Sequence, residues 1–292
     1  MTSGILNVNK PAGPSSFGIV RSVRRLPGVI KAGHGGTLDP AADGVLPILV
    51  NLATRLADFI HEWPKTYLAS VTFGITSDTG DREGSLVPTG DVSRVSRDRI
   101  EALLPSFTGS IAQVPPLYSA LKQGGEALYR KARRGEVVER RPRLVEIHAI
   151  SLVDYDPATA TGRLEVSSGR GMYVRSLAHD LGAALDCGAY LSGLTRTAVG
   201  PLTLADAVAM ATLTEAGETW TRWLLPMDLP LREWPVIALD AAAAAAIRRG
   251  QTVDAPSAAS GRCRVLDADG HLLAWGEVDI NRRLQPRAVF PS

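Results

Sequence analysis

The chain has 292 residues, of which 45% are hydrophobic and 21% charged, as expected for a soluble globular protein with one large domain or a large and a small one. It has no apolar run long enough to span a bilayer and no secretion signal, so we expect a cytoplasmic protein without a membrane partner. The net charge of +2 does not by itself indicate nucleic-acid binding, and two cysteines and five scattered histidines predict no metal site.

The first part of the chain predicts short strands and helices around one glycine-rich loop. In chain order, we expect a strand over 4–8, a helix over 15–25 capped by Ser15 or Ser16, an irregular stretch over 26–44, an apolar run over 45–50, a helix over 53–61, a strand over 65–74, a polar loop over 76–91, a helix over 97–104 and a strand over 109–113.

The second part begins with a basic segment and ends in a stretch of different pattern. After residues 117–143 we expect neighbouring strands over 144–155 and 162–168, an amphipathic helix over 173–185, a strand over 191–199, a helix over 241–249 and short strands over 262–267 and 272–278. Residues from about 234 onward are few for independent folding, so we expect a small mixed domain there.

The basic segment has two interpretations. It contains Lys122, Arg130, Lys131, Arg133, Arg134, Arg140, Arg141 and Arg143, interleaved with Tyr118 and Tyr129. Arginines next to aromatic side chains are typical of a surface that binds RNA phosphates. The same segment contains Glu126, Glu136 and Glu139, which could neutralise the arginines on a solvated helix.

The stretch GHGGTLDPAADGVLPI places Asp39 on a loop with several glycines. Glycines allow a backbone to approach a ligand closely, and Pro40 restricts Asp39 to extended conformations. A lone Asp-Pro is more often a turn or a helix cap than a site. The pattern alone therefore indicates an acidic functional loop and no particular reaction, and the spacing of a phosphate-binding loop is absent.

Ordered motifs along most of the chain resemble the TruB family of tRNA pseudouridine synthases. The Asp39 stretch resembles the family's catalytic loop. The other matching stretches are ILNVNKPAGPSS, KTYLASVTFG, PPLYSALKQGGEALYRKARRGE, SGRGMYVRSLAHDLG and LTRTAVG. Two positions depart from the family pattern: Met172 replaces the usual threonine, and Asp43 replaces the usual threonine or serine.

The resemblance implies an α+β (mixed α/β) pseudouridine synthase core over 1–233, with a central antiparallel sheet and a thumb insertion at about 115–143. A small PUA-like RNA-binding domain would follow over 234–292. It implies that Asp39 is the catalytic aspartate, that Arg175 pairs with it and that Tyr67 packs on the target base. Substrate-binding positions would be His34, which enters the T loop, together with Lys10, Leu194, Gly36 and Thr37.

The implied reaction isomerises uridine-55 in the T loop of tRNA to pseudouridine, with the base flipped out of the loop. The reaction has no redox change, so we expect no cofactor. The partner would be the T arm of tRNA, and we expect a monomer without an obligatory protein partner. An arginine beside a buried carboxylate would hold Asp39 ionised. Whether Asp39 attacks C1′, adds to C6 or removes the C2′ proton is open.

Three other functions are considered. A guide-RNA-dependent synthase of the dyskerin type shares the core motifs, but the short tail and the thumb insertion argue against it. An RNA-folding chaperone would need tRNA binding but not the reaction. A glycosidase-like enzyme usually needs two carboxylates that flank the bond, and the sequence offers no clear partner for Asp39.

Overall fold

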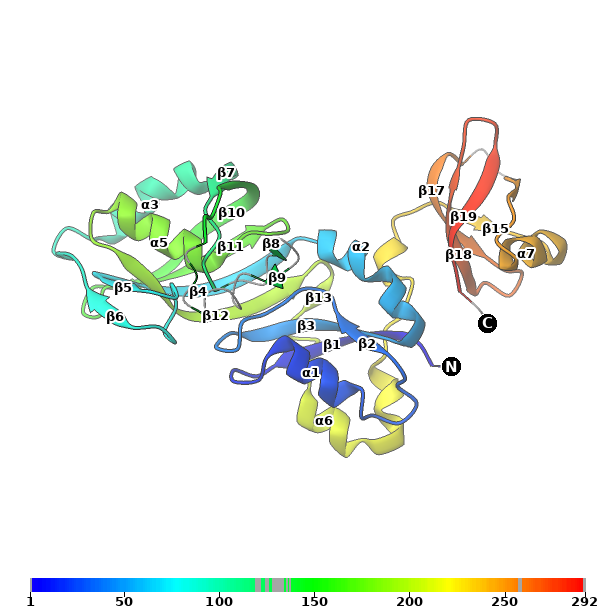
Figure 1. Cartoon of the computed structure of the whole chain (residues 1–292), viewed down its shortest axis with the longest axis horizontal. Coiled ribbons are helices and arrows are strands. Elements are labelled where there is room, and N and C mark those ends of the chain that lie inside the picture. The colour runs from blue at the N-terminus through cyan, green and yellow to red at the C-terminus, as the bar shows by residue number, and fades with distance from the viewer. Residues whose placement is uncertain are drawn as a thin grey trace.

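The computed structural model describes residues 2–118, 122–123, 126–127, 134, 136, 138–256 and 259–290. Its largest element is a mixed sheet of ten strands (Figure 1). These are β1 Gly4–Lys10, β2 Ala32–His34, β3 Asp43–Val50, β4 Lys65–Phe73, β7 Gly109–Gln113, β10 Arg143–Asp156, β11 Thr161–Ser168, β12 Ala189–Val199, β13 Leu202–Thr203 and β14 Val208–Ala209.

Helices and short hairpins flank this sheet. The helices are α1 Ser16–Val23, α2 Ala57–Glu62, α3 Arg97–Leu103, α5 Val174–Ala184 and α6 Met210–Glu215, with 3-10 segments η1 Asn51–Leu56, η2 Leu104–Phe107, η3 Gly217–Trp223 and η4 Leu229–Leu231. Two small hairpins are β5 Ile75–Ser77 with β6 Leu86–Pro88, and β8 Lys122–Gln123 with β9 Glu126–Ala127. No helix of the described residues is long and apolar enough to cross a membrane.

The sheet consists of two parts that meet at one short parallel contact. Its order is β14-β1-β3-β12-β4-β11-β10-β7, and β3 pairs with β12 only through Asp43 with Thr195 and Gly44 with Arg196. The β4–β11–β10 part is antiparallel, and so is the pairing of β1 with β3. The loop that carries Asp39 leads directly into β3, so it lies at the junction of the two parts.

Local sequence explains most of these elements. In β4, residues alternate between buried and half-buried, as a strand with one face on the core requires. Ser15 caps α1, because its side chain accepts a hydrogen bond from the backbone N–H of Gly18 at 3.1 Å. One apolar cluster lies between β4, β11 and α5, and a second lies between β1, β3 and α1.

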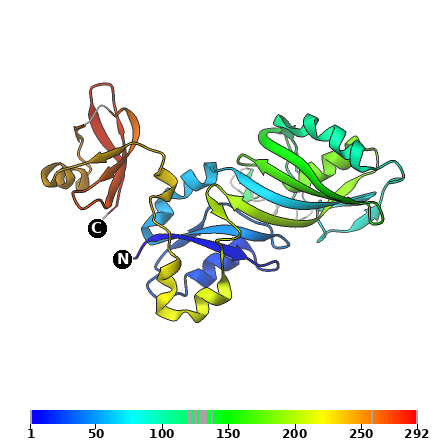
Figure 2. The ribbon, with the colours of Figure 1, turned by 180° about the vertical axis from the view of Figure 1, so that it is seen from behind.

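A second sheet with its own core follows the large one. It has the order β15-β17-β18-β19-β16, built from β15 Val236–Ala238, β16 Val253–Asp254, β17 Gly261–Leu266, β18 Leu272–Val278 and β19 Arg283–Val289, with α7 Ala241–Arg248 packed against it. Figure 2 shows it beyond the end of the large sheet, next to α2. Phe59 of α2, Trp234 and Trp275 of β18 form the contact, with ring centroids 5.0 to 5.8 Å apart.

The predicted mixed α/β class with a large central sheet is confirmed. Strand 65–74, strand 109–113, helix 97–104 and helix 173–185 are all found within a few residues of their expected bounds. Three expectations are corrected. The helix expected over 53–61 begins as the 3-10 segment η1, the loop over 76–91 contains strand residues at both ends, and the sheet is mixed because β1–β14 and β3–β12 are parallel.

Candidate active site

A cleft of about 1470 Å³ opens over the junction of the two sheet parts. Compared with the roughly 300–1,000 Å³ of a typical small-molecule pocket, it has room for a segment of a polymer. Most of the expected site residues line it: His34, Gly36, Thr37, Asp39, Tyr67, Arg175 and Leu194. Lys10 is the expected substrate-binding residue that is not part of the described cleft lining.

Lys10 supports the backbone of the Asp39 loop. It is fully buried, and its Nζ atom donates to the backbone carbonyls of Pro11, Pro40 and Ala42 at 2.9, 3.2 and 2.6 Å. These carbonyls occupy the donors of the ammonium group, which leaves none facing a ligand. The residue expected to bind substrate thus fixes the backbone just after Asp39.

Arg196 of β12 supports the same loop from below, and it was not among the predicted site residues. Its side chain is 1% exposed, and its nitrogens donate to the carbonyls of Gly36 at 3.0 Å, Thr37 at 3.3 Å and Val45 at 2.7 Å. The guanidinium thus holds together the loop and the start of β3. The LTRTAVG stretch contains this residue, but only the sheet register shows that it reaches the Asp39 loop.

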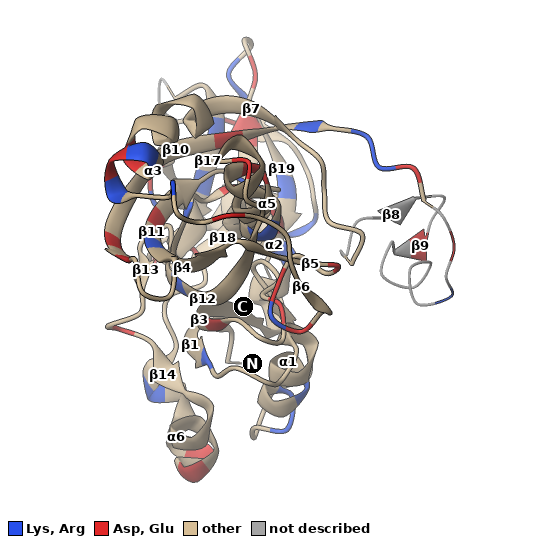
Figure 3. Ribbon diagram, turned by 90° about the vertical axis from the view of Figure 1, so that its left-hand side faces the viewer, with Lys and Arg blue, Asp and Glu red and all other residues tan. Residues whose placement is uncertain are grey.

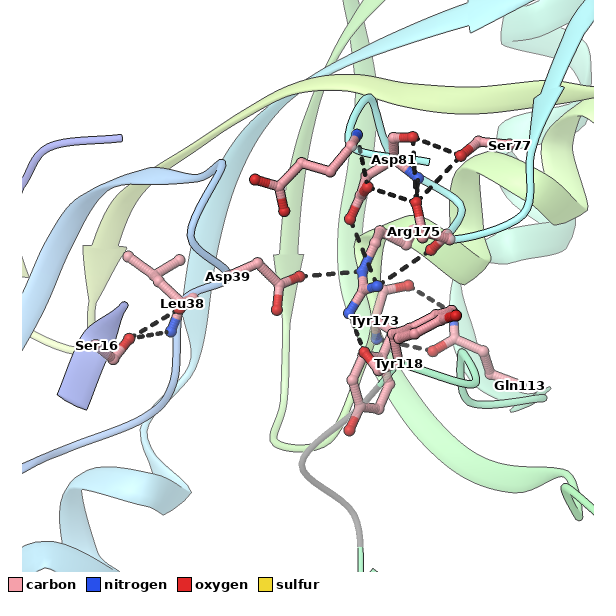
Figure 4. A network of polar contacts seen from close by, with 11 residues as sticks. Ser16, Leu38, Asp39, Ser77, Asp81, Gln113, Tyr118, Tyr173 and Arg175 are labelled. Atoms are coloured by element: carbon pink, nitrogen blue, oxygen red, sulfur yellow. Dashed lines mark hydrogen bonds and ion pairs between the residues drawn. The ribbon is translucent and has the colours of Figure 1, made fainter. Parts of the chain in front are cut away.

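Asp39 forms an ion pair with Arg175 at the floor of the cleft (Figure 4). The Nε atom of Arg175 lies 3.0 Å from Oδ2 of Asp39. Arg175 stands in the first turn of α5 and is 4% exposed, and its other nitrogens donate to the carbonyls of Thr79 at 3.1 Å and Tyr118 at 2.8 Å. The arginine is therefore oriented by the protein before any substrate binds.

A second carboxylate also contacts this arginine. Asp81 Oδ2 lies 3.5 Å from Nη1 of Arg175, and Asp81 is itself held by the Thr79 hydroxyl at 2.6 Å and by the backbone N–H of Glu83 at 3.0 Å. Sequence reasoning missed Asp81, because it lies in the polar stretch that was expected to be a loop. No local pattern shows that this stretch folds against α5.

The pKa of Asp39 lies above its ordinary value of 3.8. Burial is the largest cause, Arg175 opposes it, and the charge of Asp81 adds to the increase. The carboxylate opens onto the cleft, but the surrounding protein removes much of its hydration. We expected the arginine to hold Asp39 ionised; Arg175 does act in that direction, but burial outweighs it.

Tyr67 and Leu194 provide an apolar wall near Asp39. Tyr67 lies on β4 and is 9% exposed, and Leu194 lies on the neighbouring strand β12. Met172, one of the two departures from the family pattern, is buried in the same core cluster and also lines the cleft. Asp43, the other departure, begins β3 and leaves its Oδ1 atom buried without a hydrogen bond.

Two further basic groups line the cleft. His34 ends β2, and burial together with the neighbouring His61 lowers its pKa from the ordinary 6.5, so its imidazole is neutral at neutral pH. Burial and the nearby Arg196 lower the pKa of Lys65 to about 8. Lys65 donates to the carbonyls of His61 and Trp63 at 2.5 and 2.6 Å, so it closes the end of α2.

Part of the expected thumb lies outside the described residues, including Tyr129, Arg130, Lys131 and Arg133. Arg134 forms ion pairs with Glu126 and Glu136 at 2.6 and 2.7 Å, and Arg141 pairs with Glu139 at 3.2 Å. For these two arginines, the structure agrees with the second interpretation, in which neighbouring glutamates neutralise the basic segment. The base of the thumb also contacts the site, because the Tyr118 carbonyl accepts from Arg175.

Family models match nearly all of the chain. TruB family pseudouridylate synthase (N terminal domain) matches residues 24–174, tRNA pseudouridylate synthase B C-terminal domain matches 175–232, and Pseudouridine synthase II TruB, C-terminal, matches 235–290. Together these models cover the large sheet from β2 onward and the second sheet.

Full-length relatives and solved structures agree with these matches. The tRNA pseudouridine synthase B of Pseudomonas aeruginosa (strain UCBPP-PA14) is 44% identical over 99% of this chain and 96% of its own. The tRNA pseudouridine synthase B of Xanthomonas campestris pv. campestris (strain 8004) is 43% identical over 98% of this chain and 94% of its own. A Cbf5-Nop10-Gar1 complex contains a chain with a TM-score of 0.74 and 25% identity, over 99% of this chain and 85% of that one. A chain of the archaeal box H/ACA sRNP Nop10-Cbf5 complex has the same fold, with a TM-score of 0.72 and 24% sequence identity. The match covers 99% of this chain and 86% of that one.

Proposed function

This chain belongs to the TruB family of pseudouridine synthases, and we propose that it isomerises uridine-55 in the T loop of tRNA to pseudouridine. The observation that carries the proposal is the Asp39–Arg175 ion pair at the floor of a cleft with room for an RNA segment. The curated relatives that are 43–44% identical over nearly the whole chain are named tRNA pseudouridine synthase B. Pseudouridine synthases are isomerases, so this protein is an enzyme of that class.

Asp39 is the group that reacts. The reaction breaks the bond between C1′ and N1 of the uridine, turns the base and joins C1′ to C5. C5 then loses its proton and N1 gains one, so substrate and product contain the same atoms. A carboxylate whose pKa is raised by burial is a better base and nucleophile than a free one, provided that it is ionised. Arg175 stabilises that ionised form, and its own position is set by Thr79, Asp81 and Tyr118.

Tyr67 and Leu194 hold the base. An aromatic ring beside the carboxylate gives the detached uracil a surface on which to stack, worth about 1–3 kcal/mol per base. Its low exposure means that the ring is fixed by the core before the base arrives. Gly36 and Thr37 line the cleft through a loop whose carbonyls Arg196 holds, so this loop presents a fixed backbone to the RNA.

The target base reaches Asp39 by flipping out of the T loop, which costs a few kcal/mol of stacking. His34 occupies the space that the base leaves. A neutral imidazole suits this role, because it packs among bases without the cost of burying a charge, and the lowered pKa of His34 keeps it neutral.

The second sheet is a PUA-like RNA-binding domain that begins at residue 234, after a catalytic domain over 1–233. Its separate core and its connection through the Phe59–Trp234–Trp275 contact support this division. The protein works as a cytoplasmic monomer on the T arm of tRNA. The match of TruB models to both sheets favours this stand-alone synthase over a guide-RNA-dependent one.

The test is to incubate the purified protein alone with an unmodified tRNA transcript and to map pseudouridine along it. We expect one pseudouridine, at position 55. Conversion only after a guide RNA or a protein partner is added would support the dyskerin-type alternative, and release of free uracil would support a glycosidase. Binding that refolds the transcript without any pseudouridine would support the chaperone.

A further inference from the structure

Phe17 is a large apolar side chain that the fold leaves in solvent at the mouth of the cleft. It lies in the first turn of α1, is 61% exposed and lines the same cleft as Asp39. The packing of α1 against the core is supplied by its neighbours Ile19, Val20 and Val23, all of which are buried. The folded chain thus gives Phe17 no role in core packing, although the residue lines the cleft that contains Asp39.

The position of Phe17 is fixed relative to Asp39. The Ser16 hydroxyl accepts from the N–H of Leu38 at 2.8 Å and donates to the Leu38 carbonyl at 2.9 Å, both visible in Figure 4. The N–H of Gly13 also donates to the carbonyl of Pro40 at 2.8 Å. The start of α1 is therefore bonded to the residues on both sides of Asp39. A ligand on Phe17 would have a set distance to the carboxylate.

The face of α1 that carries Phe17 is basic. Arg21 lies one turn further on, with its guanidinium carbon 5.6 Å from the centroid of the Phe17 ring. Arg24, the C-cap of α1, and Arg25 follow at helical spacing and are exposed. Figure 3 shows basic residues in blue along and just after α1. Within the described ranges, none of the three arginines has a carboxylate oxygen within 4.0 Å.

Other exposed arginines of the chain are neutralised by neighbouring carboxylates. Arg170 pairs with Glu62, and Arg134 pairs with two glutamates. Cations at the end of a helix also stabilise its dipole, which accounts for arginines on α1 but not for an exposed ring in its first turn. An aromatic side chain with free cations beside it matches the chemistry of an unpaired nucleotide, which offers a flat base and a phosphate.

We propose that Phe17 and Arg21 form a nucleotide subsite at the mouth of the cleft, separate from the place of the target base on Tyr67. An unpaired base of the bound RNA, other than the target, stacks on Phe17. Arg21 covers one side of the ring and, with Arg24, binds the adjoining phosphates. The subsite rests on the proposed function, because its ligand is the RNA that carries the target uridine.

The test is a side-chain series at Phe17, measured on a full-length tRNA transcript. Stacking predicts that Phe17→Leu raises KM about five-fold and leaves kcat unchanged, and that Phe17→Trp restores the wild-type KM. Because the ring is exposed, Tm should not move in either variant. A Phe17→Leu protein with wild-type KM, or a Phe17→Trp protein as weak as Phe17→Leu, would overturn the subsite.

Arg21→Ala tests the phosphate contact. The slope of log Kd against log salt should become shallower by about one for this variant. Arg222→Ala is the matched control, because Arg222 also lies over an aromatic ring, that of Trp223 at 3.9 Å, but Trp223, unlike Phe17, does not line the cleft. An unchanged slope in Arg21→Ala, or an equal change in Arg222→Ala, would contradict the phosphate contact.

The two proposals fail in different ways. If the wild-type protein makes no pseudouridine at position 55, the proposed function fails, and titration of the same transcript onto the Phe17 variants still reports on stacking. If the wild-type protein is active and the Phe17 series shows no change in KM, only the subsite fails. Val153→Ala, an exposed apolar position on β10 away from the cleft lining, is the control for a general surface effect.

Discussion

The Nε atom of Arg175 lies 3.0 Å from Oδ2 of Asp39, although the arginine side chain is 5% exposed and the aspartate side chain 37%. The cation is thus enclosed by protein while its partner faces the cleft. Thr79, Tyr118 and Asp81 occupy the other nitrogens of Arg175, so the protein sets its orientation. Asp39 is the member of this pair that a substrate can reach.

Arg175→Lys should lower kcat by about 100-fold and change KM little, because an ammonium keeps the charge but cannot contact Asp39, Asp81 and two carbonyls at once. Single-turnover rates on a tRNA transcript measure the effect. Arg97→Lys, in an exposed ion pair on α3, is the control. A rate for Arg175→Lys close to that of the control would show that the several simultaneous contacts of the guanidinium have no role in the reaction.

Asp39→Asn should raise the stability of the protein at about pH 7. The pKa of Asp39 in the folded state is above its ordinary 3.8, so ionisation of this group costs folding free energy. The cost is absent well below 3.8, grows as pH rises from 3.8 to the folded-state pKa, and is fully present above that pKa. Calorimetry should therefore show a higher Tm for the variant near neutral pH, and a difference that vanishes in acid. A wild-type protein that is the more stable near neutrality would contradict the raised pKa.

Arg196→Met should destabilise the protein by about 2–4 kcal/mol, because three backbone carbonyls lose their donor in a buried place. The Asp39 loop should also lose its fixed position, so kcat should fall in the protein that remains folded. Denaturant unfolding and single-turnover rates measure the two effects. Arg163→Met, at an exposed position on β11, should change neither, and a comparable loss there would remove the case for Arg196.

Gly44→Ala should cost more stability than Gly28→Ala. Both glycines have positive φ, +100° and +76°, so each substitution carries about 1–3 kcal/mol of backbone strain. At Gly44 an added Cβ would also lie 2.2 Å from the Arg196 carbonyl oxygen, whereas at Gly28 it meets nothing within 4 Å. Urea denaturation of the two variants compares their free energies of unfolding. Equal losses of stability would mean that the backbone at the β3–β12 junction shifts at little cost to make room for the Cβ atom.

Sequence predicted the elements whose own residues determine them. Helix 173–185 was evident because its apolar residues recur at helical spacing, and strand 65–74 because its residues alternate. Helix 53–61 was only half right, since η1 and α2 divide it and η1 begins at Asn51, which has a positive φ. Parallel pairing of β3 with β12 was not predictable, because two register pairs far apart in sequence leave no periodic signal.

In the site too, residues in local motifs were predicted, and residues that act through contacts between distant segments were not. Asp39, Tyr67 and Arg175 were named from motifs, and the structure brings all three to one cleft. Asp81 and Arg196 were missed because each acts through a contact with a segment distant in sequence. Lys10 was expected to bind substrate; in the structure it is buried and donates to carbonyls of the Asp39 loop, a contact that the motif did not indicate. A motif marks which residues matter, and the fold decides which of them face the ligand.

The chemical role of Asp39 is tested most directly by comparing wild type with Asp39→Asn on one unmodified tRNA transcript and mapping pseudouridine at position 55. The substitution keeps the size of the side chain and removes the group that reacts, so the variant should bind the transcript and form no product. Product at the wild-type rate from Asp39→Asn would contradict the assignment of the reaction to this carboxylate.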